Sequence, residues 1–192
     1  MLFGLVLLFL ICTESVSLSA NSVRMRPYSG IGVVLLPETA GDHGKEPVYL
    51  YRDPGLSRLG TLDSAKLAGN EWVLGNQTSG VPLVVLARKG SWLKVCYDDA
   101  GREAWIHPNR KTYQLWDRFF KSRISHMLPG LRKQYYQLYQ QPDLKPGAML
   151  TPKQVFKVLK LENDWAMIVS DQTSIGWLRW RDEDGRLTIG VD

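Results

Sequence analysis

Cysteine is scarce in this sequence, and its scarcity excludes a fold held together by disulfides. Only two of the 192 residues are cysteines, Cys12 and Cys96. Cys12 lies beside an apolar N-terminal run that we expect to be removed, so a single thiol remains and no internal disulfide can form. Cys96 lies between Val95 and Tyr97 in a predicted strand, and we interpret it as a small buried hydrophobic residue rather than as a reactive thiol. Packed apolar cores must therefore hold the fold.

Long apolar segments are also missing, apart from one at the N-terminus that is too short to cross a bilayer. Residues 2–11 read LFGLVLLFLI, and small and polar residues follow up to Ala20. A bilayer span needs about 20 apolar residues, whereas a shorter run is typical of a secretory signal peptide. We predict a signal peptide at residues 1–20, with a retained N-terminal anchor or a lipid anchor as the alternatives. The protein is then exported to the periplasm or cell envelope.

Catalytic and metal-binding motifs are absent as well. The sequence contains no GxSxG, HExxH, P-loop or dinucleotide fingerprint. Cysteine catalysis needs an imidazole within reach and a third group that orients it, and the pattern around Cys96 and His107 indicates no such group. The three histidines lie far apart in the chain, whereas a metal site needs convergent ligands. We therefore expect no enzyme, no metal and no cofactor.

Short strand patterns, separated by turn residues, fill most of the chain. Residues 81–108 show three of them: an apolar run at 81–87, an alternating run at 92–97 and a third at 104–106. Similar patterns recur at residues 31–36, 48–51, 59–62, 135–139, 155–159, 165–169, 176–178 and 187–189. The sequence therefore predicts a mainly β protein.

The two halves of the chain align with each other. Aromatic residues at matching positions are Tyr51 and Tyr139, Trp92 and Trp165, and Trp105 and Trp177. Spacings differ between the halves, so the first half carries about 15 extra residues before Val81. We predict two small all-β domains, at residues 31–108 and 134–192, with an insert at about 63–80 in the first.

These repeated motifs resemble the bacterial SH3-like (SH3b) domain family. The first copy reads LYRDPG…LGTL and VVLARKGSWLKVCYDDAGREAWI, and the second reads LYQQPDL…FKVLKLENDWAMIVSDQTSIGWL. The second copy has the closing Gly-Trp of the family at Gly176 and Trp177, whereas in the first copy Ala104 precedes Trp105. The resemblance implies two five-stranded SH3-like barrels in an exported protein. It also implies non-catalytic binding of cell-wall peptides or of other proteins.

Residues 109–133 lie between the two copies and differ from them in charge and periodicity. Their apolar residues fall on one face of a helix over residues 113–128, and Pro129 follows as a stop signal. The segment has seven Lys and Arg residues and a single acidic one, Asp117. We interpret residues 109–133 as a basic amphipathic connector helix. Its cations, among them Arg118, Lys121 and Arg123, are either simply solvated or face an acidic partner or anionic surface.

Aromatic side chains are the candidates for ligand binding, because their rings offer a large rigid surface with a polar group. The candidate residues are Tyr49, Tyr51, Trp72, Trp105, Tyr139 and Trp177. We expect Tyr51, Trp72 and Trp105 to form a groove, unless Trp72 packs the insert onto the first barrel instead. The predicted function is an exported binding protein for cell-wall material or a peptide, and export argues against a nucleic-acid partner. The alternative is a structural or adaptor subunit of an envelope protein complex.

Overall fold

The structure is a computed structural model that describes residues 25–36, 47–62, 67, 69–75, 80–108, 112–152, 154–170 and 174–192. The predicted signal peptide lies outside the described residues. Parts of the predicted insert at 63–80 and residues 109–111 of the predicted connector lie outside them too. Within the described ranges, no helix combines the length and the apolar character needed to cross a membrane.

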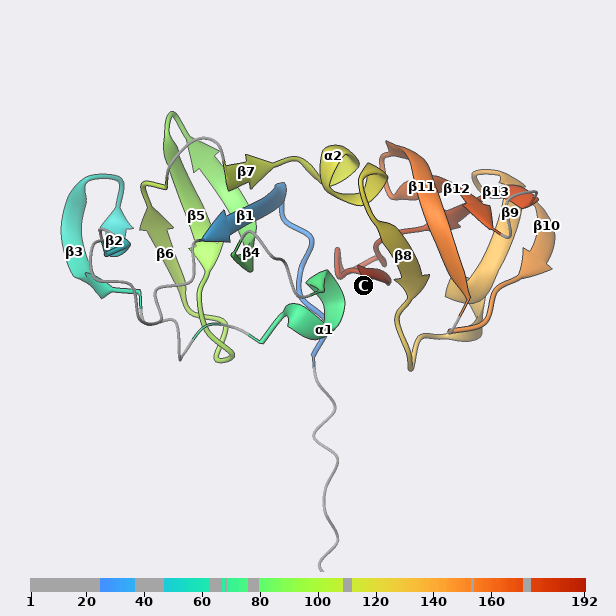
Figure 1. Ribbon diagram of the computed structural model, residues 1–192, viewed down its shortest axis with the longest axis horizontal. Coiled ribbons are helices and arrows are strands. Elements are labelled where there is room, and N and C mark those ends of the chain that lie inside the picture. Colours follow the sequence, from blue (N-terminus) through green and yellow to red (C-terminus); the bar gives the residue numbers. More distant parts are fainter. Residues whose placement is uncertain are drawn as a thin grey trace, which may run out of the picture.

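Two antiparallel sheets of seven strands each account for most of the structure (Figure 1). The first sheet contains β1 (Gly32–Leu36), β2 (Tyr49–Asp53), β3 (Leu56–Thr61), β4 (Val81–Lys89), β5 (Trp92–Cys96), β6 (Glu103–Ile106) and β7 (Tyr113–Gln114). The second contains β8 (Ile124–Met127), β9 (Gln137–Gln141), β10 (Leu144–Met149), β11 (Val155–Glu162), β12 (Trp165–Ser170), β13 (Ser174–Arg179) and β14 (Ile189–Val191). The prediction of a mainly β protein is confirmed.

Both sheets have the same strand order. It is β3-β2-β6-β5-β4-β1-β7 in the first sheet and β10-β9-β13-β12-β11-β8-β14 in the second. Each strand of the first sheet thus has a counterpart seven places later in the chain. Where counterpart strands overlap, a residue of one sheet has an equivalent position in the other.

The prediction of closed five-stranded barrels does not hold for the described strands, which form open seven-stranded sheets. β1 and β7 extend the first sheet beyond β4, and β8 and β14 extend the second beyond β11. An edge strand leaves a row of N–H and C=O groups without partners. Here β1 pairs with the edge of β4 and β8 with the edge of β11, although neither strand belongs to the sequence motifs that align between the two copies.

The prediction of a connector helix over residues 113–128 is wrong in extent. Helix α2 spans only Trp116–Lys121, and β7 and β8 flank it. Residues Ile124–Met127 alternate between exposed and buried, as a strand does. Ile124 and Met127 are also three residues apart, so their spacing fits a helix equally well. Pairing of β8 with β11 and β14 decides the conformation.

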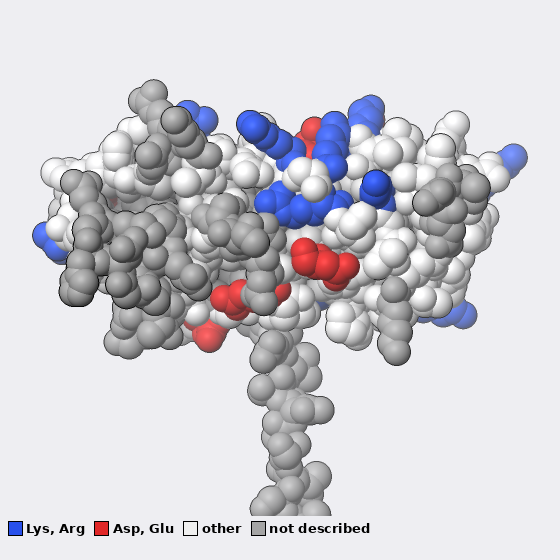
Figure 2. Space-filling view, viewed as in Figure 1, with Lys and Arg blue, Asp and Glu red and all other residues white. Residues whose placement is uncertain are grey.

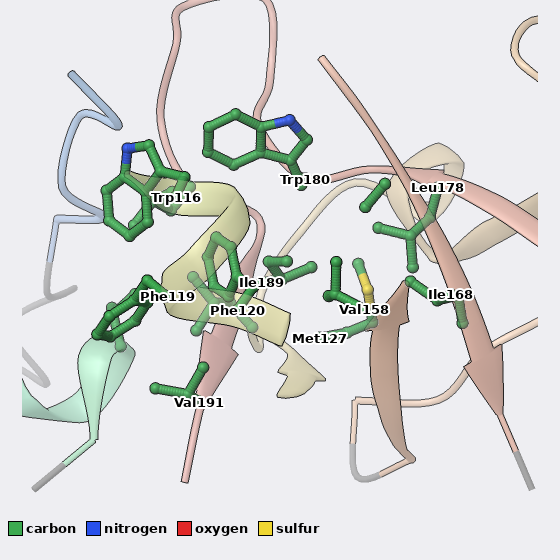
Figure 3. Close-up of a cluster of buried hydrophobic side chains, with 14 of the residues drawn as sticks. Trp116, Phe119, Phe120, Met127, Val158, Ile168, Leu178, Trp180, Ile189 and Val191 are labelled. Atoms are coloured by element: carbon green, nitrogen blue, oxygen red, sulfur yellow. The ribbon is translucent and has the colours of Figure 1, made fainter. Parts of the chain in front are cut away.

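Helix α2 forms the centre of a core that the two sheets share (Figure 3). The Trp116 and Phe120 rings stack with their centroids 5.2 Å apart, and the Trp180 ring lies 6.0 Å from that of Phe120. The first sheet contributes Val33, Leu35 and Val84, and the second contributes Met127, Phe156, Val158, Ile168, Leu178, Ile189 and Val191. A separate core inside the first sheet contains Val34, Leu36, Leu83, Val85, Leu93, Val95 and Ile106.

Each sheet has an inner face, which lines its own core, and an opposite outer face. In β1, Val34 points to the inner face of the first sheet, whereas Val33 points to the outer face and into the shared core. The shared core lines the inner face of the second sheet. The second sheet, with α2, therefore covers part of the outer face of the first.

Polar contacts between the segment before β1 and the loop before β14 reinforce this joint. Ser29 N donates to Gly185 O at 2.8 Å, and Arg26 Nη2 lies 2.6 Å from Asp182 Oδ2. Helix α1 (Glu71–Leu74), in the predicted insert, packs against β14. A Cβ at Gly190 of β14 would lie 2.8 Å from Val73 O. The close approach of α1 to β14 thus requires glycine at this position.

Candidate functional site

A tyrosine and a tryptophan face each other on the outer face of the first sheet. Tyr51 of β2 is in register with Trp105 of β6. Their neighbours Leu50, Ala104 and Ile106 are buried in the first-sheet core, so the two-residue period of a strand turns both rings outward. Both rings are half-buried, so each retains an open edge or face.

The second sheet repeats this pair at the equivalent positions. Tyr139 of β9 is in register with Trp177 of β13, and both side chains are half-buried. The reason is again alternation, because Leu138 and Leu178 on either side point into the shared core. Figure 1 shows β2 and β6 at one end of the molecule and β9 and β13 at the other.

A second tryptophan supports the tyrosine of each pair. Tyr51 meets Trp92 edge-to-face at 5.1 Å, and Tyr139 meets Trp165 in the same way at 5.3 Å. His107 lies against Trp92 at 5.0 Å, and at the equivalent position the Arg179 guanidinium lies 4.9 Å from the Trp165 ring. Aromatic contacts of this geometry fix ring orientation, so the half-buried Tyr–Trp pairs are held in place before any ligand arrives.

Tyr49 lies two residues before Tyr51 on the same face of β2. The Arg58 guanidinium of β3 covers its ring, 3.6 Å from the centroid. In the second sheet the equivalent residue is Gln137, so the surface beside the pair differs between the sheets. A cation over a ring stabilises the stack, and it also places positive charge next to the first Tyr–Trp pair.

Trp72 does not join Tyr51 and Trp105 in a groove. It belongs to α1 and packs, half-buried, against the shared core. Trp72 therefore helps to join the two sheets, which corrects the predicted three-residue groove. The reason is the close packing of α1 against β14, which lies far from it in sequence.

The predicted cations Arg118, Lys121 and Arg123 lie on or next to α2. Lys121 Nζ is 2.8 Å from Asp117 Oδ2, whereas the Arg118 side chain is exposed. Arg123 Nη1 donates to Phe119 O at 2.8 Å, and burial lowers the pKa of the Arg123 guanidinium. Figure 2 shows Lys and Arg side chains gathered over α2. This basic surface lies between the two sheets, and the aromatic pairs lie at the ends.

A cavity of about 200 Å³ lies on the outer face of the first sheet, under residues 25–28. Its lining includes Met25, Tyr28, Val84, Leu86, Cys96 and Glu103. Burial raises the pKa of the Cys96 thiol, and the carboxylates of Asp98 and Glu103 act in the same direction. The thiol is therefore protonated at neutral pH, which makes it a weak nucleophile.

Cys96 and His107 do not meet. Cys96 ends β5, whereas His107 lies against Trp92 at the start of that strand. Four residues of extended chain separate the two ends, which is roughly 13 Å. Across the part of the chain that the structure describes, no three His, Cys, Asp or Glu side chains are placed to hold a metal ion.

No known protein-family model matches this sequence, and no curated protein matches it either. The functional reading therefore depends on the geometry of the described residues.

Sequence reasoning missed the residues that surround the aromatic pairs. Leu56 at the start of β3 and Leu144 at the start of β10 are 66% and 58% exposed. Both follow the Pro-containing turn that the two copies share, so the alignment of the copies could have identified them. No sequence pattern identifies the cations at Arg58, Lys160 and Arg179, because cation–ring contacts depend on strand register.

Proposed function

We propose that this chain is a non-catalytic binding protein, with two SH3-like units that each recognise a peptide or a peptide-bearing cell-wall polymer. One observation carries the proposal: the same half-exposed Tyr–Trp pair occurs at equivalent positions of both sheets. Packing alone does not require an open aromatic pair in each sheet. Rigid aromatic surfaces with O–H and N–H donors are typical of sites that bind peptides and sugars.

The arrangement of strands supports the SH3-like assignment. Within the larger sheets, five consecutive strands follow the order β3-β2-β6-β5-β4 in one half and β10-β9-β13-β12-β11 in the other. These strands hold the motifs that resemble the family. In this proposal each half is an SH3-like unit to which two more strands have been added.

Charge beside the first aromatic pair favours a ligand that carries carboxylates. Arg58 lies over Tyr49 beside that pair. In the second sheet Lys160 Nζ lies 6.0 Å from the Trp177 ring, but it is paired with Glu162 at 2.6 Å. Peptides and wall peptides that carry carboxylates complement this arrangement. Export to the envelope, proposed from residues 1–20, would bring the protein to such ligands.

Co-sedimentation with purified cell wall tests the proposal. We expect the full chain to be retained, and Trp105→Ala with Trp177→Ala together to abolish retention. Trp72→Ala is the matched control, because Trp72 is also half-buried but lies outside both pairs. No retention of the unaltered protein, or full retention of the double variant, would contradict the proposal.

The alternative is an adaptor subunit of an envelope complex, and the edge strands favour it. All of β10 is exposed, and so is β3 apart from a half-buried Gly60. Such edges accept an added strand from another protein. Co-purification of one stoichiometric protein from envelope extract, with no wall retention, would favour this alternative.

A further inference from the structure

A row of side chains crosses four strands on the outer face of the second sheet. Ile124 of β8 is in register with Lys157 of β11. Lys157 is in register with Val169 of β12, which is in register with Ile175 of β13. The aliphatic residues on this face are exposed by 40% at Ile124, 49% at Val155, 38% at Leu159 and 66% at Ile175. Cross-strand neighbours of this kind form a continuous surface rather than scattered single residues.

The equivalent row of the first sheet is covered by the chain itself. It runs from Val33 through Val84 and Cys96 to Glu103. Val33 is in register with Val84 and Cys96 with Glu103, and the pairing of Val85 with Val95 places Val84 beside Cys96. Val33 and Val84 are buried in the shared core. Residues 25–28 lie over Cys96 and Glu103, across the cavity of about 200 Å³. A short segment of the chain itself, residues 25–28, therefore occupies this part of the face in the first sheet.

Charge within the row of the second sheet indicates the occupant. In the first sheet Glu103 is paired with Lys94, and Arg26 of the segment above it is paired with Asp182, so the charges of the row do not hold that segment. In the second sheet Lys157 lies within the row, and no carboxylate among the described side chains is paired with it. An acidic segment would thus complement Lys157.

Charged groups of both signs border the row of the second sheet. Asp192, whose backbone N donates to Ile124 O at 3.3 Å, has its carboxylate paired with His126. Leu161 N of β11 donates to Asp117 Oδ1 of α2 at 3.2 Å, which places α2 beside the end of β11. Asp117 is paired with Lys121, and Glu162 with Lys160 at 2.6 Å. Among the described side chains, no carboxylate forms an ion pair with Lys157 or Arg118. Figure 2 shows the cations over α2 and a largely uncharged surface beside them over β8 and β11.

We propose that the outer face of the second sheet binds an extended polypeptide segment in which acidic and aliphatic residues alternate. Its aliphatic side chains lie on Ile124, Val169 and Ile175, and its carboxylates reach Lys157 and Arg118. A second copy of this chain is a poor occupant, because a symmetric contact would set the unpaired Lys157 of one copy against that of the other. The site lies beside the Tyr139–Trp177 pair and does not depend on it.

Fluorescence anisotropy with two synthetic peptides tests the proposal. The first probe is a labelled peptide of about ten residues, long enough to cross four strands, in which Leu and Glu alternate. In the second probe Lys replaces Glu. We expect the full chain to bind the Leu/Glu peptide at least tenfold more tightly than the Leu/Lys peptide.

Two exposed substitutions, each with a matched control, locate the site. Lys157→Glu reverses the preference between the peptides, whereas Lys89→Glu on the first sheet leaves it unchanged. Ile175→Asn weakens binding of the Leu/Glu peptide at least fivefold, and Leu56→Asn, at a residue with the same 66% exposure, does not. Equal binding of both peptides, or equal effects of site and control variants, would overturn the proposal.

Two further measurements separate this proposal from its competitors. Binding to anionic vesicles that Lys157→Glu abolishes, without binding of the Leu/Glu peptide, would overturn it in favour of a lipid surface. Trp177→Ala is expected to lower wall retention and to leave Leu/Glu binding unchanged. Failure of the wall-binding proposal is thus distinguishable from failure of this one.

Discussion

The two sheets share one strand order but differ in how their equivalent strands are buried. All five residues of β1 are buried, whereas its counterpart β8 alternates between exposed and buried positions. The same contrast separates β4 from β11, which is exposed at every second residue of its first half. The first sheet lies between its own core and the shared core, and the second has a core on one face only. Whether a strand has one or both faces buried, rather than which strands it pairs with, thus determines whether its buried residues alternate or are continuous.

Removing a ring from the shared core is the most severe test of this comparison. Phe119 is fully buried between the sheets. We expect Phe119→Ala to lower the free energy of unfolding by about 3–5 kcal/mol. Urea unfolding followed by fluorescence and by circular dichroism should show both sheets unfolding in one transition.

Leu115 provides the control for this substitution. It precedes α2 and is 60% exposed, so Leu115→Ala should change stability by less than about 0.5 kcal/mol. Two separate unfolding transitions, with only one shifted by Phe119→Ala, would contradict the idea that one core joins the sheets.

Equivalent substitutions in β1 and β8 test the difference in burial directly. Val33 is 0% exposed, whereas Ile124 at the equivalent position is 40% exposed. We expect Val33→Ala to cost about 2–3 kcal/mol, from the lost methyl groups and the cavity left behind. Ile124→Ala removes more atoms but should cost less than about 1 kcal/mol. Chemical denaturation of both variants measures the difference, and equal losses would refute it.

The aromatic pairs test whether the two sheets act alike in binding. Because the pairs lie at opposite ends of the molecule (Figure 1), the full chain should bridge two wall fragments. We expect Trp105→Ala or Trp177→Ala alone to weaken retention roughly tenfold and to abolish bridging, measured as turbidity of wall fragments. If either single variant still bridges as well as the unaltered chain, the two pairs are not equivalent sites.

The smallest expected effect concerns pH and the turn after β5 in the first sheet. Burial raises the pKa of Asp98, but hydrogen bonds from Arg102, including one from its backbone N at 2.9 Å, outweigh burial and lower it below the ordinary value. Because the folded-state pKa lies below the unfolded one, the stabilisation is present above about pH 4. It is lost as the pH falls through the folded-state pKa.

Asp98→Asn should therefore lower stability at pH 7 by about 1 kcal/mol and weaken the dependence of unfolding on acidic pH. Asp143 of the second sheet is the control, because its ion pair with Arg179 is long, at 3.4 Å, and its carboxylate is 72% exposed. Asp143→Asn should change stability by less than about 0.5 kcal/mol. Thermal melts of the unaltered protein and the two variants between about pH 3 and 7 measure how the stability of each depends on pH.

The sequence predicted most strands because alternation and turn residues are local signals. It missed β10, since Pro146 and Gly147 interrupt it and all its residues are exposed. The predicted helix ran from α2 through β8, because apolar residues three apart occur both on one face of a helix and in a strand with buried residues on both faces. Of the candidate site, it named all four rings of the two Tyr–Trp pairs, because each ring alternates with core residues in its strand, but it did not pair Tyr139 with Trp177. It misplaced Trp72, whose partner surface comes from the other end of the chain.

The sequence alone determined that this protein is mainly β, with matching aromatic residues in its two halves, because strand period and motif spacing are local properties of the sequence. Only the tertiary structure decided which face of each sheet is open. That choice depends on α1, α2 and residues 25–31 packing against partners more than a hundred residues away or in the other sheet. Burial is a property of the assembled layers, so the open face of the second sheet became visible only once both sheets were in place.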